Sequence, residues 1–440
     1  MDQTQTHQVL SFKPRQQHLS EYDSIERCIR CAQCLPVCPT YSLSAMETES
    51  PRGRVALVRG LLEGKLEATP NLDRLLRVCL DCRACQTACP NGVRVGEMVV
   101  SARADLEARS NGVSLGRRVV RFVAFDWVLA SHRNLEIATA LARVYQRMGL
   151  QDLVRGAGVL RGLPVLDSLE RFLPRLPDGA LRRQLPEVTP ARAETRHRVG
   201  FFLGCVMSTV FADASLATVD VLTRNGCEVV VPREIQCCGA PLLTEGARDR
   251  AKKLAAANID LFLDARVEAV VTDCAACGAE LKHYRDLFED DPHYAKKAEE
   301  FSARCLDITE LLVQLVPADP PTGEVRKVVT YHEPCHLVHA QGLAREPREL
   351  LRVIPGLQLV EMKRSDWCCG SAGSYTFTHR GYSLSLLEQK VSNAMATGAD
   401  VIVTGNPGCA LQLRYGLERS GKGVGVSFFT QLLKESYDRS

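Results

Sequence analysis

The sequence predicts an α/β protein with an all-α N-terminal part, followed by two repeated parallel α/β domains rich in cysteine. Three observations support this fold class. Two cysteine runs near the N-terminus have the same spacing and enclose residues with helical periodicity. Residues 199–440 contain an internal repeat in which predicted strands alternate with predicted helices. The chain of 440 residues also exceeds what one hydrophobic core normally supports, so two or three domains are expected.

Both N-terminal cysteine runs follow the pattern C-x2-C-x2-C-x3-C-P. This is the ligand spacing of a bacterial ferredoxin with two 4Fe-4S clusters, in which the fourth cysteine of each run binds the other cluster. One predicted ligand set is Cys28, Cys31, Cys34 and Cys89, and the other is Cys79, Cys82, Cys85 and Cys38. The alternatives are a pair of zinc sites or a disulfide framework. Zinc would use two Cys-x2-Cys pairs per site, which leaves the third, evenly spaced cysteine of each run unexplained.

The two runs are separated by a long insert with helical character. Val55, Val58 and Leu61 recur at helical spacing, and Leu72 to Leu76 form a second such set that leads into Cys79. A compact β-rich ferredoxin would join its runs more tightly. The sequence therefore predicts a helical two-cluster ferredoxin domain over residues 20–108.

Residues 109–198 form the next predicted segment, an arginine-rich helical linker that ends in proline-broken sequence. Arginines recur among apolar residues at Arg117, Arg118, Arg121, Arg133, Arg143, Arg147, Arg155 and Arg161. One interpretation is that these helices pack on neighbouring domains with solvated arginines outward. The other is that a basic amphipathic surface meets an anionic membrane or an acidic partner. The sequence does not choose between the two.

The repeat in the C-terminal half predicts two domains, over residues 199–318 and 325–440. The first half carries Cys205, Cys237, Cys238, Cys274 and Cys277, and the second carries Cys335, Cys368, Cys369 and Cys409. Corresponding cysteines are 130 to 132 residues apart, and each follows a predicted strand. Because loops at the carboxyl ends of parallel strands converge, distant cysteines are expected to meet in one crevice per domain. Buried apolar cysteine is the alternative, but matching positions in both halves argue against it.

The pattern of Cys205, Cys237-Cys238-Gly239 and Cys274-x2-Cys277 resembles the cysteine-rich CCG domain of the heterodisulfide reductase family. The resemblance implies that the first half holds a non-cubane 4Fe-4S cluster on five thiolates, and Gly239 and Gly370 would let the backbone approach the metal centres. In the second half Asn406 stands where the repeat predicts a cysteine. An ordinary cluster, a zinc ion or an empty thiol pocket therefore remain open there.

The whole arrangement resembles the iron-sulfur subunits of bacterial glycolate oxidases, with CIRCAQCLPVCPTY, SPRGR, CCGSAGSY and GNPGC as its most specific stretches. The resemblance implies an electron-transfer subunit of a complex that oxidises glycolate or a related 2-hydroxy acid on flavin-bearing partner subunits. Electrons would then pass toward a membrane acceptor such as quinone. Lactate dehydrogenase subunits, a heterodisulfide or thiol-disulfide reductase, and a zinc-binding redox scaffold or sensor without catalytic flux are the alternatives.

No catalytic residue is predicted on this chain. The sequence lacks a Gly-x-Gly-x2-Gly turn for a nicotinamide or flavin, and iron-sulfur clusters accept one electron at a time, so a flavin protein must be the partner. His332, His336 and His339 flank Cys335, where a histidine is more often a packing residue than a metal ligand. Cys227 and Cys305 are interpreted as buried, inert thiols.

Composition limits the remaining options. The formal net charge of +3 is too small to indicate nucleic-acid binding. The longest apolar stretch, from Val119 to Ala130, is interrupted by Arg121 and Asp126 and is too short for a membrane span. The N-terminus lacks the apolar segment of a signal peptide, and nineteen cysteines in so long a chain favour iron-sulfur ligation over secreted disulfides. A cytoplasmic location is expected, with peripheral association at the inner face of the membrane as a second option.

Overall fold

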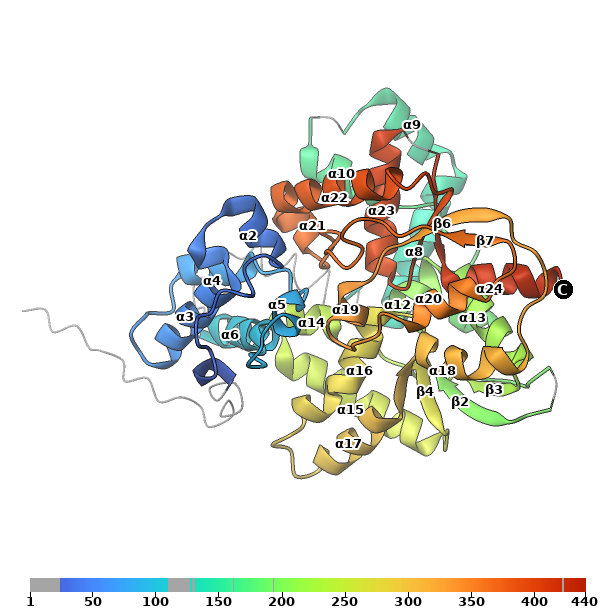
Figure 1. The fold of residues 1–440 in the computed structure, drawn as a ribbon, viewed down its shortest axis with the longest axis horizontal. Coiled ribbons are helices and arrows are strands. Elements are labelled where there is room, and N and C mark those ends of the chain that lie inside the picture. The colour runs from blue at the N-terminus through green and yellow to red at the C-terminus, as the bar shows by residue number, and fades with distance from the viewer. Residues whose placement is uncertain (1–23, 110–126, 129–130, 161, 193, 422) are drawn as a thin grey trace, which may run out of the picture. The chain divides into compact units, whose positions relative to one another are not determined.

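A computed structural model describes residues 24–109, 127–128, 131–160, 162–192, 194–421 and 423–440 (Figure 1). The chain divides into two compact units, residues 1–110 and 111–440. The linker segment and both cysteine repeats therefore fall within one unit. Arg117, Arg118, Arg121 and Arg161 lie outside the described residues.

The described part of the first unit is built from helices. Its elements are α2 (Pro39–Ser44), the 3-10 helix η2 (Glu47–Glu49), α3 (Pro51–Leu62), α4 (Pro70–Arg77), α5 (Ala84–Thr87) and α6 (Val95–Arg109). Ser50 caps α3 by accepting a hydrogen bond from the Gly53 N–H, and Pro51 occupies the first helical position. The predicted insert helices are confirmed: Val55, Val58 and Leu61 on α3 pack with Leu72 and Leu76 on α4 in one apolar core.

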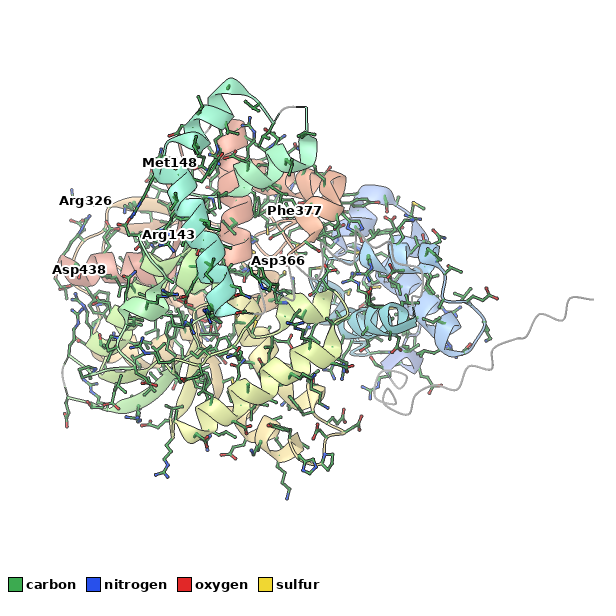
Figure 2. The ribbon with its side chains drawn as sticks, turned by 180° about the vertical axis from the view of Figure 1, so that it is seen from behind. Arg143, Met148, Arg326, Asp366, Phe377 and Asp438 are labelled. Atoms are coloured by element: carbon green, nitrogen blue, oxygen red, sulfur yellow. The ribbon has the colours of Figure 1, made fainter. Side chains whose placement is uncertain are left out.

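The linker helices begin the second unit. They are α8 (His132–Arg147), α9 (Leu150–Ala157), α10 (Pro164–Phe172) and α11 (Leu181–Gln184). Several of their arginines are engaged within the unit: Arg143 and Arg147 donate hydrogen bonds to Asp178, and Arg155 pairs with Glu170. Apolar residues also face solvent here: Leu141 on α8 is 67% exposed. Met148, which caps the C-terminal end of α8, is likewise 67% exposed (Figure 2).

The first repeat contains a five-stranded sheet in the order β1-β3-β2-β4-β5. The strands are β1 (Val188–Thr189), β2 (His197–Phe201), β3 (Cys227–Val230), β4 (Ala269–Thr272) and β5 (Cys305–Asp307). All pairs are parallel except β1 with β3, so an antiparallel edge strand supplements the predicted parallel sheet. The helices are α12 (Cys205–Thr209), α13 (Ala212–Arg224), α14 (Ala240–Thr244), α15 (Arg248–Asp264), α16 (Ala275–Leu287), α17 (Ala295–Arg304) and α18 (Ile308–Leu315).

The second repeat contains a four-stranded, fully parallel sheet in the order β7-β6-β8-β9. The strands are β6 (Lys327–Tyr331), β7 (Leu357–Leu359), β8 (Val401–Thr404) and β9 (Gly425–Phe428). This order matches β3-β2-β4-β5 of the first repeat, which confirms the internal duplication. The helical elements are η4 (Val316–Ala318), α19 (Cys335–Val338), α20 (Glu346–Arg352), α21 (Tyr375–Thr378), α22 (Arg380–Met395), α23 (Pro407–Ser420) and α24 (Phe429–Asp438).

The two repeats pack on one another. Helix α24 at the C-terminal end lies against α13 of the first repeat (Figure 1). Thr218 on α13 donates a hydrogen bond to Thr430 on α24 at 3.1 Å, and the rings of Phe211 and Phe428 meet edge to face with centroids 5.1 Å apart. None of the described helices combines the length and apolar character needed to cross a membrane.

Candidate metal centres

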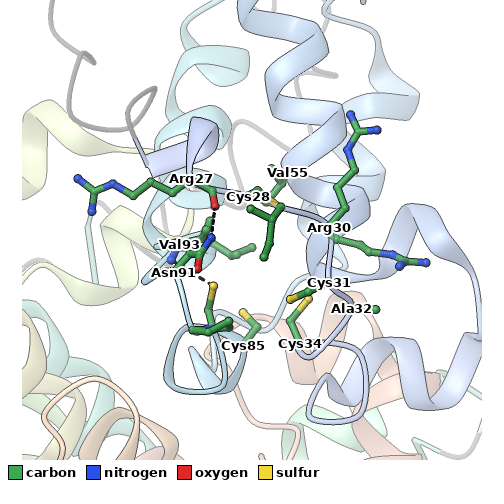
Figure 3. A pocket seen from close by; sticks show the side chains of 15 residues that line it. Arg27, Cys28, Arg30, Cys31, Ala32, Cys34, Val55, Cys85, Asn91 and Val93 are labelled. Atoms are coloured by element: carbon green, nitrogen blue, oxygen red, sulfur yellow. Dashed lines mark hydrogen bonds between the residues drawn. The ribbon is translucent and has the colours of Figure 1, made fainter.

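The first unit contains two cysteine-lined cavities. The larger, of about 410 Å³ including space open to solvent, is lined by Cys28, Cys31, Cys34, Cys85 and Cys89. In Figure 3 the sulfur atoms of Cys31, Cys34 and Cys85 point toward the same space. The cavity thus combines the first three cysteines of one run with the last cysteine of the other, as the ferredoxin spacing predicts.

The second cavity, of about 350 Å³, is lined by Cys38, Cys79, Cys82 and Cys85. These are the four residues of the second predicted ligand set. Cys85 borders both cavities, so the two sites are adjacent within the unit. A short path between two redox centres is the arrangement that electron transfer requires.

Both cysteine runs have the same unusual backbone. Arg30 and Ala32 adopt left-handed conformations with φ of 56° and 70°, and Asp81 and Arg83 do so with φ of 50° and 61°. In each run these are the second and fourth residues after the first cysteine. Left-handed residues alternating with other conformations wrap the chain tightly and turn successive N–H groups toward one concave space. The equal spacing of the cysteines therefore corresponds to an equal local geometry.

Arg54 places a buried positive charge beside the second cavity. It belongs to the SPRGR stretch, is 2% exposed, and points Nη1 toward the Sγ of Cys38 at 3.8 Å and Nη2 toward Thr40 Oγ1 at 2.9 Å. Although burial opposes its charge, nearby Cys79 and Cys38 raise the pKa of Arg54 above its usual value. Among the described residues this buried guanidinium forms no ion pair with a carboxylate, which suits a site that carries negative charge.

In the first repeat all five predicted cysteines come together. Their thiols form a continuous series of contacts in the order Cys205, Cys237, Cys238, Cys277 and Cys274, and all are buried. Cys205 follows β2 and Cys274 follows β4, the neighbouring strands between which the strand order reverses. The site therefore lies at the switch point of the sheet, where loops at the carboxyl ends diverge and leave a crevice.

The charge states of these thiols fit a metal cluster. Hydrogen bonds from Cys205 and Cys238 lower the pKa of Cys237 well below its ordinary value, while contact with Cys237 raises the pKa of Cys205 and of Cys238. In the absence of a cation, a thiolate at Cys237 therefore opposes ionisation of its neighbours Cys205 and Cys238. A positively charged iron-sulfur core would allow the others to ionise, because thiolate is the ligand form of cysteine.

The structure gives the two glycines of the CCG motifs a role in addition to the predicted approach to a metal centre. Gly239 and Gly370 have φ of +89° and +85°, a conformation that other residues avoid. A Cβ on Gly239 would lie 3.2 Å from Ala251, and one on Gly370 would lie 2.6 Å from the Ser383 carbonyl oxygen. Both glycines are thus required by a left-handed turn packed against a helix, α15 or α22. This turn places the preceding cysteine pair.

The second repeat assembles four cysteines and a histidine. The thiols of Cys335, Cys368, Cys369 and Cys409 form a series of contacts in that order. The ligand atoms of His332, Cys369 and Cys409 all lie within 4.8 Å of one another, and His332 is fully buried. The sequence favours a packing role for His332 over a ligand role, because its position at a strand-to-helix junction does not show that the ring lies buried beside two cysteines.

Asn406 occupies the position of the missing cysteine and lies between the two sites. Its Nδ2 donates a hydrogen bond to the Sγ of Cys409 at 3.4 Å, while its Oδ1 accepts from the Cys274 thiol at 3.8 Å and from the Ala276 N–H at 3.3 Å. A single amide therefore connects the cysteine clusters of both repeats.

Two cysteines lie outside these sites, as predicted. Cys227 is fully buried on β3, and burial raises its pKa to about 11. Cys305 opens β5, and its thiol donates to the Phe301 carbonyl at 3.2 Å. Both behave as packing residues.

Fold and sites together define an iron-sulfur protein that transfers electrons. A 4Fe-4S dicluster domain matches residues 24–93, a cysteine-rich domain matches residues 199–282 and 329–414, and the linker region of the glycolate oxidase iron-sulfur subunit matches residues 116–173. The chain belongs to the family of glycolate oxidase iron-sulfur subunits.

Individual relatives agree with this assignment. The chain is 40% identical to the probable glycolate oxidase iron-sulfur subunit of Bacillus subtilis, over 90% of this chain and 89% of the relative, and 34% identical to the glycolate oxidase iron-sulfur subunit of Escherichia coli, over 89% and 91%. Lactate utilization protein A of Shouchella clausii is 32% identical, over 53% of this chain and 98% of its own. A hypothetical protein from Helicobacter pylori shares the fold, with a TM-score of 0.54 at 10% identity over 96% of this chain and 73% of that one.

Proposed function

We propose that this chain carries electrons from flavin-bearing partner subunits, where glycolate or a related 2-hydroxy acid is oxidised, toward a membrane acceptor such as quinone. Two 4Fe-4S clusters would be held by Cys28, Cys31, Cys34 and Cys89 and by Cys79, Cys82, Cys85 and Cys38. A further cluster would be held by the five cysteines of the first repeat. In this proposal the chain works at the inner face of the cytoplasmic membrane without crossing it.

The observation that carries the proposal is the pairing of two adjacent cavities, each lined by cysteines from both N-terminal runs. The residues of the chain supply thiolates, exclude water and adjust charge around each centre. When bound, the clusters supply single-electron chemistry. Because oxidation of a hydroxy acid delivers two electrons as a hydride, a flavin on another subunit must separate them.

Glycolate is favoured over lactate as the substrate of the complex by the extent of similarity. The relatives named as glycolate oxidase subunits align along about nine tenths of this chain, whereas a lactate utilization protein A aligns along about half. The linker region that matches the glycolate oxidase subunit supports the same choice.

The test is a complex purified without oxygen, compared with its Cys82→Ala variant. Cys82 is expected to bind the second cluster, so the variant should lose about four irons and one paramagnetic signal. Reduction of the partner flavin by glycolate should persist, while electron delivery to a quinone analogue should fall sharply. Cys305→Ala is the matched control, since it removes a buried thiol that no site uses.

The outcomes separate the alternatives. Unchanged electron delivery by the Cys82→Ala complex would refute the proposed route. A chain that purifies without a flavin subunit and reduces disulfides on its own would indicate a thiol-disulfide reductase. Stoichiometric zinc with little sulfide at the N-terminal sites would indicate a zinc scaffold.

A further inference from the structure

We propose that the second repeat binds a zinc ion through His332, Cys369 and Cys409, with a thiolate of the Cys335–Cys368 pair in the fourth position. This centre goes beyond the proposed electron-transfer function, because zinc has no redox chemistry. It would make the two repeats chemically different: a cluster in the first and a mononuclear metal in the second.

The spacing of the ligand atoms distinguishes one metal ion from a cluster. In a tetrahedral zinc site with bonds of about 2.0 to 2.3 Å, neighbouring ligand atoms are about 3.5 to 3.8 Å apart. The atoms of His332, Cys369 and Cys409 lie within 4.8 Å of one another. Among the described residues this is the one group of three or more such ligands that is so compact. In the first repeat, by contrast, no three described ligand atoms lie so close together.

His332 has no other partner of normal hydrogen-bond geometry. Its side chain is fully buried, and neither Nδ1 nor Nε2 has a hydrogen bond. A buried polar atom without a partner costs about 1 to 3 kcal/mol, so two on one ring need an explanation. A bound metal would satisfy one nitrogen, and the backbone of Ser365 lies near the ring.

Comparison of the repeats shows coordinated differences. His332 precedes Cys335 by three residues, as Phe202 precedes Cys205, and Asn406 replaces the cysteine corresponding to Cys274. The second repeat thus loses a thiol and gains an imidazole at its metal-facing edge. Three thiolates and a histidine around one ion are a usual zinc set, whereas the five-thiolate set of the first repeat is not available.

Lys390 supplies a third difference. Gly239 contacts Ala251 on α15, and Gly370 contacts Ser383 on α22, so corresponding residues of these two helices are 132 positions apart. Lys390 on α22 therefore corresponds to Asn258 on α15. Lys390 is 1% exposed, and its Nζ donates to the carbonyl oxygens of Arg364 and Ser365 at 2.5 and 3.1 Å. Zinc with three thiolates carries one negative charge, which the buried ammonium would balance.

The experiment measures zinc in the full chain purified without oxygen. About one zinc per chain is expected, and X-ray absorption at the zinc edge should show both nitrogen and sulfur ligands. His332→Gln should weaken zinc binding, measured by competition with a chromophoric chelator, by at least about tenfold, since loss of even outer-shell partners costs that much. Cys335→Ser and Cys368→Ser identify the fourth ligand: only one of them should lower zinc affinity.

Two further variants keep the test decisive. Tyr331→Phe alters the neighbouring buried residue, whose hydroxyl has no partner, and should retain zinc. His332→Cys should retain zinc with an all-sulfur shell, which tests the role of His332 even if His332→Gln fails to fold. The proposal is overturned if the wild-type chain lacks zinc, if its zinc has no nitrogen ligand, or if His332→Gln binds zinc unchanged. Iron and sulfide counts, which test the proposed function, are independent of these results.

Discussion

The guanidinium of Arg54 reaches the sulfur of Cys38 across the wall of the second N-terminal cavity, at 3.8 Å. Among the described residues that line the first cavity, no cationic side chain is buried in this way. Arg27 and Arg30 are exposed there, and Arg52 is partly exposed. The two neighbouring sites therefore differ in electrostatic environment although their cysteine spacing is identical.

Replacement of Arg54 by Gln should lower the reduction potential of the centre held by Cys38, Cys79, Cys82 and Cys85. Reduction adds negative charge, and a buried cation stabilises the reduced state, so its loss favours the oxidised state. Redox titration followed by paramagnetic resonance measures the potentials. Arg59→Gln, which removes the pair between Arg59 on α3 and Glu63 at the C-terminal end of this helix, should change neither potential. Equal potentials in wild type and Arg54→Gln would contradict this role.

Much of this fold could be predicted because apolar periodicity and cysteine spacing are local features of the sequence. Strands such as those before Cys205 and Cys335 are apolar runs of ordinary length, and the duplicated cysteine spacing specifies which loops correspond. Features that depend on burial could not be predicted. Lys390 and Asn258 are polar residues on amphipathic helices, and only the packed structure shows that they face the loops before the cysteine pairs. The sequence likewise does not specify that linker arginines such as Arg147 and Arg155 bind the carboxylates of Asp178 and Glu170.

The roles of glycine in the two CCG motifs lead to a graded prediction. Gly398 has φ of +70° with nothing within 4 Å of a new Cβ, so Gly398→Ala should cost only the strain of a left-handed alanine, about 1 kcal/mol. Gly239→Ala adds a contact at 3.2 Å and should cost slightly more. Gly370→Ala forces a Cβ to 2.6 Å from the Ser383 carbonyl and should cost about 3 kcal/mol.

Urea unfolding of the three glycine variants checks this order. If Gly370→Ala were no more destabilising than Gly398→Ala, the packing of the motif against α22 would not be the reason for glycine there. A loss of metal from Gly370→Ala without a loss of stability would instead support the close approach of backbone to metal that the sequence suggested.

Asp307 should make the stability of the second unit depend on pH. It caps α18, is buried, and accepts hydrogen bonds from the Thr309 N–H and hydroxyl, yet burial raises its pKa from 3.8 to about 6. Between these values the folded chain binds more protons than the unfolded chain, so stability falls as pH rises through this window and levels off above it. Ionisation of Asp307 between pH 5 and pH 7 should lower the free energy of unfolding by about 1 kcal/mol.

Asp307→Asn keeps a good capping residue but does not titrate. The unfolding midpoint of the variant should therefore rise relative to that of wild type as the pH increases from 5 to 7. Asp264→Asn, at an exposed position, serves as the control and should show no such gain. A constant difference between Asp307→Asn and wild type across this range would show that Asp307 has an ordinary pKa in the folded state.

Asn406 should affect the metal centres of both repeats at once. Its amide contacts the sulfur of Cys409 in its own repeat and the sulfur of Cys274 in the other. Asn406→Ala removes both contacts and the acceptor for the Ala276 N–H at the start of α16. We expect a changed paramagnetic signal from the cluster proposed in the first repeat, because hydrogen bonds to sulfur tune such clusters, together with faster loss of metal from the second repeat to a chelator.

Gln341→Ala is the matched control for Asn406→Ala. Gln341 also bridges the repeats, since its Nε2 donates to the Ala275 carbonyl at 2.9 Å and to the His336 carbonyl at 3.2 Å, and neither acceptor is a sulfur atom. Both variants should lose about 1 kcal/mol of stability from a broken contact. Only Asn406→Ala should alter the signal of the first-repeat cluster. The same spectral change in both variants would mean that general loosening between the repeats, rather than the amide at the sulfur atoms, determines the environment of that cluster.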